Sequence, residues 1–145
     1  MGMSRRIGAM GLLLAMGACG GPPAPSAMGD FLENTTWHLR SIDALRVEDD
    51  SGDGPWLRVD PADGRVEGFA GCNTFQGPYR AGGTTVTFGP VATTRRACPE
   101  DRGGEIERLM LDLVQQADGY RVGEGRLELM VDGRIRGLFV AGPAR

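Results

Sequence analysis

Three cysteines and one histidine are the side chains of this sequence with the greatest reactive potential. Cys19, Cys72 and Cys98 could be acylated, joined in a disulfide or bound to a metal, and His38 could act as a general base. His38 stands beside a tryptophan in a stretch typical of a strand, which favours a surface or rim position, and no second histidine or acid is spaced to complete a catalytic triad. A metal site would need both later cysteines, His38 and carboxylates, yet no CxxC or HxxxH spacing occurs. The sequence therefore predicts no catalytic residue, no metal site and no cofactor, with a thiol-based or hydrolytic enzyme as the minor alternative.

Cys19 follows a short stretch that has the three parts of a secretory signal. Arg5 and Arg6 form the positive region, the next dozen residues form the apolar core, and small residues precede the cysteine. This core is shorter than the ~20 residues of a transmembrane helix. The cysteine at its end looks like the acylated cysteine of a bacterial lipobox. We therefore expect residues 1–18 to be a lipoprotein signal peptide and Cys19 to carry a fatty acyl chain such as palmitate, with an ordinary cleaved signal or an uncleaved anchor as alternatives.

Residues 19–30 are expected to form a flexible linker, because proline and glycine dominate them and nothing there could pack. The linker would hold a domain at the membrane surface. Gly20 is no obvious inner-membrane retention residue, which favours the outer membrane. The expected location is the cell envelope, with the chain anchored by its lipid, facing the periplasm and monomeric.

Cys72 and Cys98 remain as an even pair if Cys19 is lipidated. An even number of cysteines in an exported domain favours a disulfide. The loop that this bond would close has about 25 residues, for which the chain-entropy estimate gives about 3 kcal/mol of stabilisation. Two buried free thiols are the alternative.

The charge of the chain argues against a nucleic-acid partner. All 16 basic residues are arginine, against 19 acids, and removal of the leader leaves 14 arginines and a net charge of −5. No basic patch stands out, so binding to a phosphate backbone is not expected.

Residues 31–141 predict one domain of many short strands and one helix, long enough for a single core. Strands are expected at 35–42, 56–60, 65–70, 84–88, 120–122, 126–131 and 134–141. Asp63-Gly64 and Asp132-Gly133 are hairpin signals, the second typical of a type I′ turn. Because one helix cannot cover both faces of a parallel sheet, the fold class is α+β, mostly antiparallel β with one packed helix.

The helix is predicted by an apolar stripe of period 3.6. Its members are Ile106, Leu109, Met110, Leu113, Val114 and Ala117. Asp118-Gly119 suits its end, and the acids near its start, including Glu105 and Glu107, suit the helix dipole.

One segment is more specific than these patterns. Residues 68–79 read GFAGCNTFQGPY, which resembles the G-x-x-G-C-N-x-F-x-G-x-Y signature of the META domain (HslJ-like) family. Residues 93–98 match a second part, a threonine followed by Ala-Cys before a helix, although Arg96 stands where the family often has methionine. An early Thr-x-Trp-x-Leu strand and a closing Leu-x-Leu hairpin extend the resemblance over 31–141. The matching motif residues are Gly68, Gly71, Cys72, Asn73, Phe75, Gly77, Tyr79, Ala97 and Cys98.

The resemblance implies a compact META domain with a barrel-like or strongly curved sheet, found in envelope proteins that are often lipoproteins. It makes the two motif cysteines spatial neighbours and supplies no catalytic residue. From the residues themselves, Gly71 and Gly77 permit unusual backbone angles, Asn73 can bond its own turn, and Phe75 and Tyr79 can enter the core.

These observations predict a non-enzymatic envelope lipoprotein that binds another envelope protein or stabilises the envelope under stress. The alternative is a periplasmic β domain that binds a small ligand, which would need a sizeable closed pocket with convergent polar groups.

Overall fold

The computed structural model describes residues 31–49, 51–98 and 102–143. The expected signal peptide, the linker and Cys19 lie outside the described residues. Within the described part of the chain, no helix is both long and apolar enough to span a bilayer.

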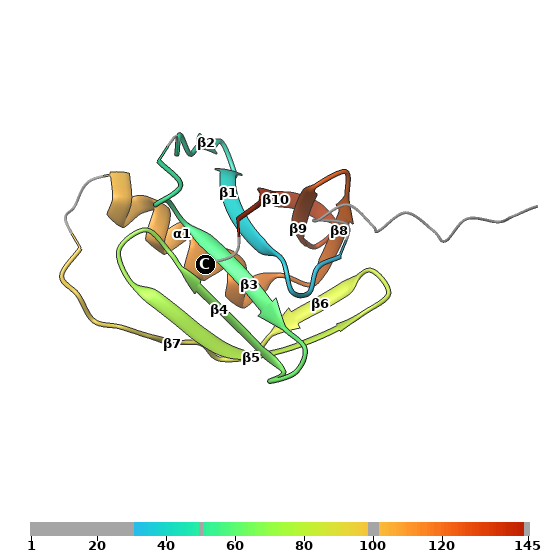
Figure 1. Ribbon diagram of the computed structural model, residues 1–145. Helices are drawn as coiled ribbons and strands as arrows, with labels where there is room; N and C mark the ends of the chain where they lie inside the picture. The colour runs from blue at the N-terminus through green and yellow to red at the C-terminus, as the bar shows by residue number, and fades with distance from the viewer. Residues whose placement is uncertain (1–30, 50, 99–101, 144–145) are drawn as a thin grey trace, which may run out of the picture.

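Ten strands, counted over the described residues, form one antiparallel sheet, and eight of them close into a barrel (Figure 1). The strands are β1 (Thr36–Ile42), β2 (Leu45–Arg46), β3 (Trp56–Asp60), β4 (Arg65–Phe69), β5 (Thr74–Gly82), β6 (Thr85–Phe88), β7 (Ala92–Thr93), β8 (Gly119–Gly123), β9 (Arg126–Val131) and β10 (Arg134–Gly142). The barrel order is β1-β3-β4-β5-β6-β8-β9-β10, and β10 pairs with β1 to close it. The mostly antiparallel, barrel-like class predicted from the sequence is confirmed.

Short turns connect most neighbouring strands. Asp132 and Gly133 join β9 to β10 with φ values of 51° and 73°, the pair of positive angles that a type I′ hairpin needs. The predicted turn type is therefore confirmed. Three strands were not predicted: β2 and β7, which have only two residues each, and β5, which has nine.

Side chains fill the barrel interior. Trp37, Leu39 and Phe139 are fully buried there. Helix α1 (Arg102–Gln116) packs against β1, β6 and β9, and its buried residues join the same core. They include Ile106, Met110, Leu113 and Val114, whereas Leu109 is only partly buried. Figure 1 shows α1 running behind β3 and β4.

Among neighbouring strands of the barrel, β6 and β8 have the shortest stretch of paired residues. One pair of residues, Thr85 and Gly119, is in register there, and the main-chain N–H of Tyr120 donates to the Thr84 carbonyl over 2.8 Å. Helix α1 lies between these strands in sequence and packs against β6. The helix thus supports the barrel where strand pairing is shortest.

The sequence had suggested a surface or rim position for His38, but the residue is buried. It is 3% exposed on β1. Its cross-strand neighbours are Trp56 on β3 and Val140 on β10, and its ring lies over Gly142, where a Cβ atom would come within 2.2 Å of the imidazole. Because Gly142 on the neighbouring strand has no side chain, there is room for the His38 ring. The alternation of residues along β1 does not reveal which residue faces His38 from the neighbouring strand.

Candidate functional site

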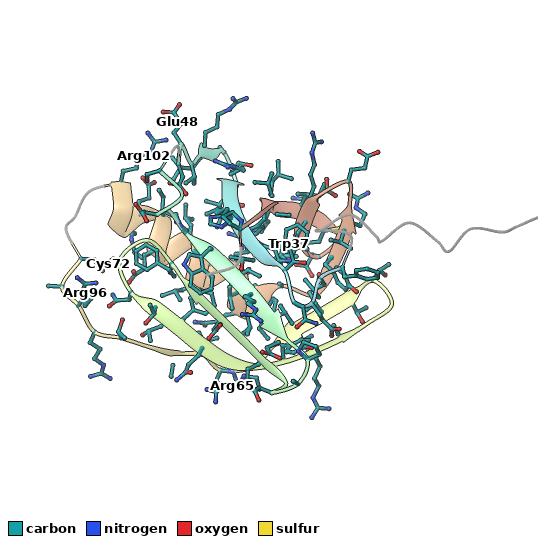
Figure 2. All side chains as sticks on the ribbon, in the orientation of Figure 1. Trp37, Glu48, Arg65, Cys72, Arg96 and Arg102 are labelled. Atoms are coloured by element: carbon teal, nitrogen blue, oxygen red, sulfur yellow. A yellow bond between two sulfur atoms is a disulfide. The ribbon has the colours of Figure 1, made fainter. Side chains whose placement is uncertain are left out.

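The motif cysteines meet beside the N-terminal part of helix α1. Cys72 lies in the turn between β4 and β5, and Cys98 follows β7 (Figure 2). Their sulfurs form a disulfide across 26 residues of chain, with the Cα atoms 5.8 Å apart. The predicted pairing is confirmed, and it fastens the segment of residues 94–98 to the β4–β5 turn.

Asn73 holds the same segment through hydrogen bonds. Its Oδ1 accepts from the Arg96 main-chain N–H (2.7 Å) and from the Thr94 hydroxyl (2.9 Å), and its Nδ2 donates to the Arg96 carbonyl (3.3 Å). Asn73 is 5% exposed. Within its own turn, the Asn73 side chain contacts the neighbouring cysteine, with Nδ2 3.7 Å from Cys72 Sγ, while its main-chain partners lie in the distant segment. The turn is closed by main-chain atoms, from the Ala70 N–H to the Asn73 carbonyl (2.8 Å), so the amide is free to pair with an extended segment distant in sequence.

Glu107 of helix α1 completes the arrangement. Its Oε2 accepts from the main-chain N–H groups of Cys72 (3.0 Å) and Asn73 (2.5 Å), and its Oε1 accepts from Asn73 Nδ2 (2.9 Å). Only 9% of Glu107 is exposed. Its role is therefore to bond the turn and not only to favour the helix dipole. The signal in the sequence was its spacing of three and seven residues from Met110 and Val114, which puts an acid on the buried face. We call Cys72, Asn73, Cys98 and Glu107 the clamp.

The motif glycines are needed more for the close approach of neighbouring chain segments than for unusual backbone angles. Gly71 does have a positive φ, 125°, and a Cβ there would lie 3.2 Å from the Gly103 carbonyl. Gly77 does not have a positive φ, so the expectation of an unusual backbone angle is wrong at this position. A Cβ atom on Gly77 would instead lie 2.9 Å from the Pro90 carbonyl oxygen. At Gly68 a Cβ would lie 2.3 Å from the Trp56 carbonyl oxygen. These positions let neighbouring backbone segments approach the turn.

The two motif aromatics have different places. Phe75 is 2% exposed and belongs to the core, as expected. Tyr79 packs against the core with its hydroxyl directed outward, where it donates to Glu33 Oε1 over 2.6 Å. Burial and this hydrogen bond raise the pKa of Tyr79 to about 12.

A second polar cluster fastens the opposite half of the helix. The Arg136 guanidinium on β10 donates two hydrogen bonds of 2.8 Å to the Asp43 carboxylate and one of 3.1 Å to Asp112 on α1. These bonds hold the pKa of Asp43 below its usual range. The cluster joins the β1–β2 turn, helix α1 and β10, because the guanidinium pairs with a carboxylate on each of the other two elements.

The surface beside the clamp is exposed and hollowed. Arg95, Arg96 and Ala97 are exposed although the clamp fixes the backbone of their segment. Arg96 and Ala97 line an open hollow of about 380 Å³ together with Cys72. In Figure 2, Cys72 and Arg96 lie close together, away from Arg65.

The clamp also contains possible metal ligands. The sulfurs of Cys72 and Cys98 and a carboxylate oxygen of Glu107 all lie within 4.8 Å of one another. His38, named in the sequence as a possible ligand, is not part of this group. While the sulfurs form a disulfide, the carboxylate is the one charged donor of the three.

Comparisons with known proteins agree with this architecture. The family model of the META domain matches residues 30–141. The structure is similar to the NMR structure of a protein from Burkholderia xenovorans (TM-score 0.63, 22% identity, covering 90% of this chain and 100% of that one). It is also similar to a second NMR structure (TM-score 0.61, 17% identity, covering 75% and 90%). A crystal structure of a DUF4847 family protein from Bacteroides vulgatus is a third neighbour (TM-score 0.53, 16% identity, covering 79% and 96%).

Among curated proteins, none matches this chain. The structural likenesses, all under 25% identity, show the fold alone, whereas the family model covers nearly the whole barrel and the clamp. Because this family model matches nearly all of the described barrel, the chain belongs to the META domain family.

Proposed function

We propose that this chain is a non-enzymatic binding protein of the bacterial cell envelope, which contacts an anionic protein partner through the exposed segment of residues 94–97. One observation carries the proposal. The clamp fixes the backbone of this segment by a disulfide and by hydrogen bonds from Asn73, yet leaves the side chains of Arg95 and Arg96 exposed.

A fixed backbone favours binding because less conformational freedom is lost when a partner docks. Arginine suits such a segment, since its planar guanidinium can pair with carboxylates in a bidentate way. The domain carries net negative charge, so two adjacent arginines are a local exception that favours an anionic partner surface. The filled barrel interior supports a surface function over a buried ligand.

The envelope location rests on the leader and on Cys19. We expect Cys19→Ala to release the protein from the membrane fraction, because the acyl chain is the proposed anchor. Membrane fractionation of cells that express the full chain measures this, with Gln76→Ala, at an exposed position of β5, as the control that keeps Cys19 and the disulfide. A Cys19→Ala chain that is correctly processed and stays in the membrane fraction would show that lipidation is not the anchor.

Site-specific photo-cross-linking in intact cells tests the partner surface. A photoreactive residue at position 97 should give one discrete adduct, and the double change Arg95→Glu and Arg96→Glu should reduce its yield about tenfold, equivalent to about 1.4 kcal/mol. Arg65→Glu is the matched control, because Arg65 is exposed at the other end of β4 and lies away from Arg96 in Figure 2. An adduct that survives the double charge reversal, or that forms equally from position 87 on β6, contradicts the proposal.

Small-ligand binding is the second candidate, and one hollow favours it. This open depression of about 350 Å³ is lined by the partly buried Trp56, by Glu67 and by polar residues of β5 and β7. Trp37 is fully buried, so a ligand here would change the fluorescence of Trp56 alone. Titration with soluble peptidoglycan fragments, repeated with Trp56→Phe, measures this. Absence of any saturable change in the wild-type protein rejects these fragments as ligands.

A further inference from the structure

The three ligand atoms of the clamp suggest a second chemical state of the same site. We propose that, once the disulfide is opened, Cys72, Cys98 and Glu107 bind one Zn²⁺ ion, with water in the fourth position. The inference goes beyond the proposed function and does not depend on it.

The donor set suits zinc. Thiolate and carboxylate are both zinc ligands, and two soft thiolates favour Zn²⁺ over Mg²⁺ or Ca²⁺. Two thiolates bound to one ion at ~2.3 Å with tetrahedral angles lie about 3.8 Å apart. With the Cα atoms 5.8 Å apart, the side chains reach this spacing by rotation about their Cα–Cβ bonds.

The carboxylate is already oriented for the ion. Oε2 of Glu107 is engaged by two main-chain N–H groups, which leaves Oε1 facing the sulfurs, 3.4 Å from Cys98 Sγ. Asn73 Nδ2 lies 3.1 Å from Cys98 Sγ and 3.7 Å from Cys72 Sγ, and it also donates to Glu107 Oε1 and to the Arg96 carbonyl, so a thiolate would share one of its two hydrogens with these acceptors. Outer hydrogen bonds of this kind fix the orientation of metal ligands and raise metal affinity.

An open hollow borders the site at Cys72. The hollow of about 380 Å³ is lined by Cys72 itself, by Gly71 and Arg96, and by the first turn of α1 at Gly103. It is open to the surface, so it offers a path for the ion and room for a water ligand. Three protein ligands and one open position are the arrangement of zinc sites that exchange ligands.

The change of state needs a reductant, for which a dithiol suffices. The dithiol supplies two electrons and two protons, the S–S bond breaks to give two thiols, and the dithiol becomes a disulfide. Zn²⁺ then displaces the two thiol protons, which pass to solvent. The segment of residues 94–98 remains fastened to the β4–β5 turn and to α1, now through the ion.

Cobalt substitution tests the site directly. The full chain with Cys19→Ala, in detergent, is reduced with dithiothreitol, freed of it without oxygen, and titrated with Co²⁺ and then Zn²⁺. One equivalent of Co²⁺ should produce thiolate-to-cobalt absorption in the near ultraviolet and the visible bands of tetrahedral cobalt, and Zn²⁺ should abolish both. The oxidised chain should produce neither. Glu107→Gln should weaken binding by about tenfold or more, whereas Glu105→Gln, exposed on the same helix, should not.

Two results overturn the proposal. One is a reduced chain that gives no thiolate-to-cobalt absorption at one equivalent. The other is a Glu107→Gln chain, folded by near-ultraviolet circular dichroism, that binds as tightly as the parent. If Glu107→Gln does not fold, zinc-edge X-ray absorption of the parent decides: two sulfurs at ~2.3 Å with oxygen ligands at ~2.0–2.2 Å support the site, and any other set contradicts it.

Discussion

Asn73 donates to both carboxylate oxygens of Glu107, with its main-chain N–H on Oε2 and its side-chain N–H on Oε1. The two residues are 34 positions apart in sequence. Through this pair the β4–β5 turn is bound to helix α1, and through the remaining bonds of Asn73 it is bound to residues 94–96. The most recognisable motif of the sequence is therefore a junction between three chain segments.

Removing the Asn73 amide should strongly destabilise the domain. Asn73→Ala leaves the part-buried Arg96 N–H and one buried Glu107 oxygen without this partner, which we expect to lower the free energy of unfolding by about 2–3 kcal/mol. Urea denaturation measures this, with the exposed Gln76→Ala on β5 as the control within about 0.5 kcal/mol of the parent. A loss under about 1 kcal/mol for Asn73→Ala would mean that the junction contributes little to stability.

The disulfide should stabilise the oxidised protein by constraining its unfolded state. Replacing Cys72 and Cys98 together with alanine is expected to cost about 3 kcal/mol and to lower the melting temperature. The comparison is made between chains that both carry Cys19→Ala, so that lipidation does not differ. Identical melting curves for the oxidised parent and the double variant would reject a stabilising role.

Gly68 and Gly82 form a matched pair for testing close packing. Gly68→Ala places a Cβ atom 2.3 Å from a main-chain oxygen of Trp56, so a strand must shift and we expect a loss of about 2 kcal/mol or more. Gly82→Ala meets nothing within 4 Å and should be neutral or slightly stabilising. Thermal denaturation of both variants checks this. Equal effects at the two positions would show that backbone entropy, and not contact, explains Gly68.

The raised pKa of Tyr79 predicts that the folded protein loses stability at alkaline pH. Its pKa is raised to about 12 in the folded protein by burial and by the bond to Glu33, against about 10 for an unfolded chain. The folded state therefore holds the proton more strongly, so this contribution is complete below pH 10 and is lost as the pH rises from about 10 to about 12. Urea midpoints across this range measure the loss, and Tyr79→Phe should flatten it. A parent and a Tyr79→Phe variant with the same pH dependence would contradict the assignment.

The strands and the helix that were predicted from the sequence are those in which buried and exposed side chains follow a regular period. Strand 56–60 and strand 126–131 were placed at their observed bounds because inward and outward side chains alternate along them. The helix was visible as an apolar stripe for the same reason. Strands β2 and β7 were missed because two residues are too few to show a period. Strand β5 was missed because Gly77 and Pro78 interrupt it and are typical of turns.

The parts that could not be predicted depend on contacts between distant segments. His38 is buried by Trp56, Val140 and Gly142, which lie far from it in sequence. The disulfide was expected from the count of cysteines, but the partners of Asn73 were not, because the register between β5 and residues 94–96 follows from the whole barrel. Glu107 was assigned a local electrostatic role, although its spacing in the helix places it on the buried face; its donors could not be predicted, because they belong to a turn 34 residues away.

The chain enters the barrel at the end farthest from the clamp. Asn34 donates to the Val59 carbonyl and Glu33 accepts from Tyr79, which places the start of the domain beside the end of β3, whereas Cys72 lies beyond the far end of β4. One strand of five residues, about 15 Å, separates the two ends. The domain thus has a polarity: for a protein tethered through Cys19, as proposed, the arginines and the sulfurs lie at the end of the barrel opposite to the one at which the tethered chain enters.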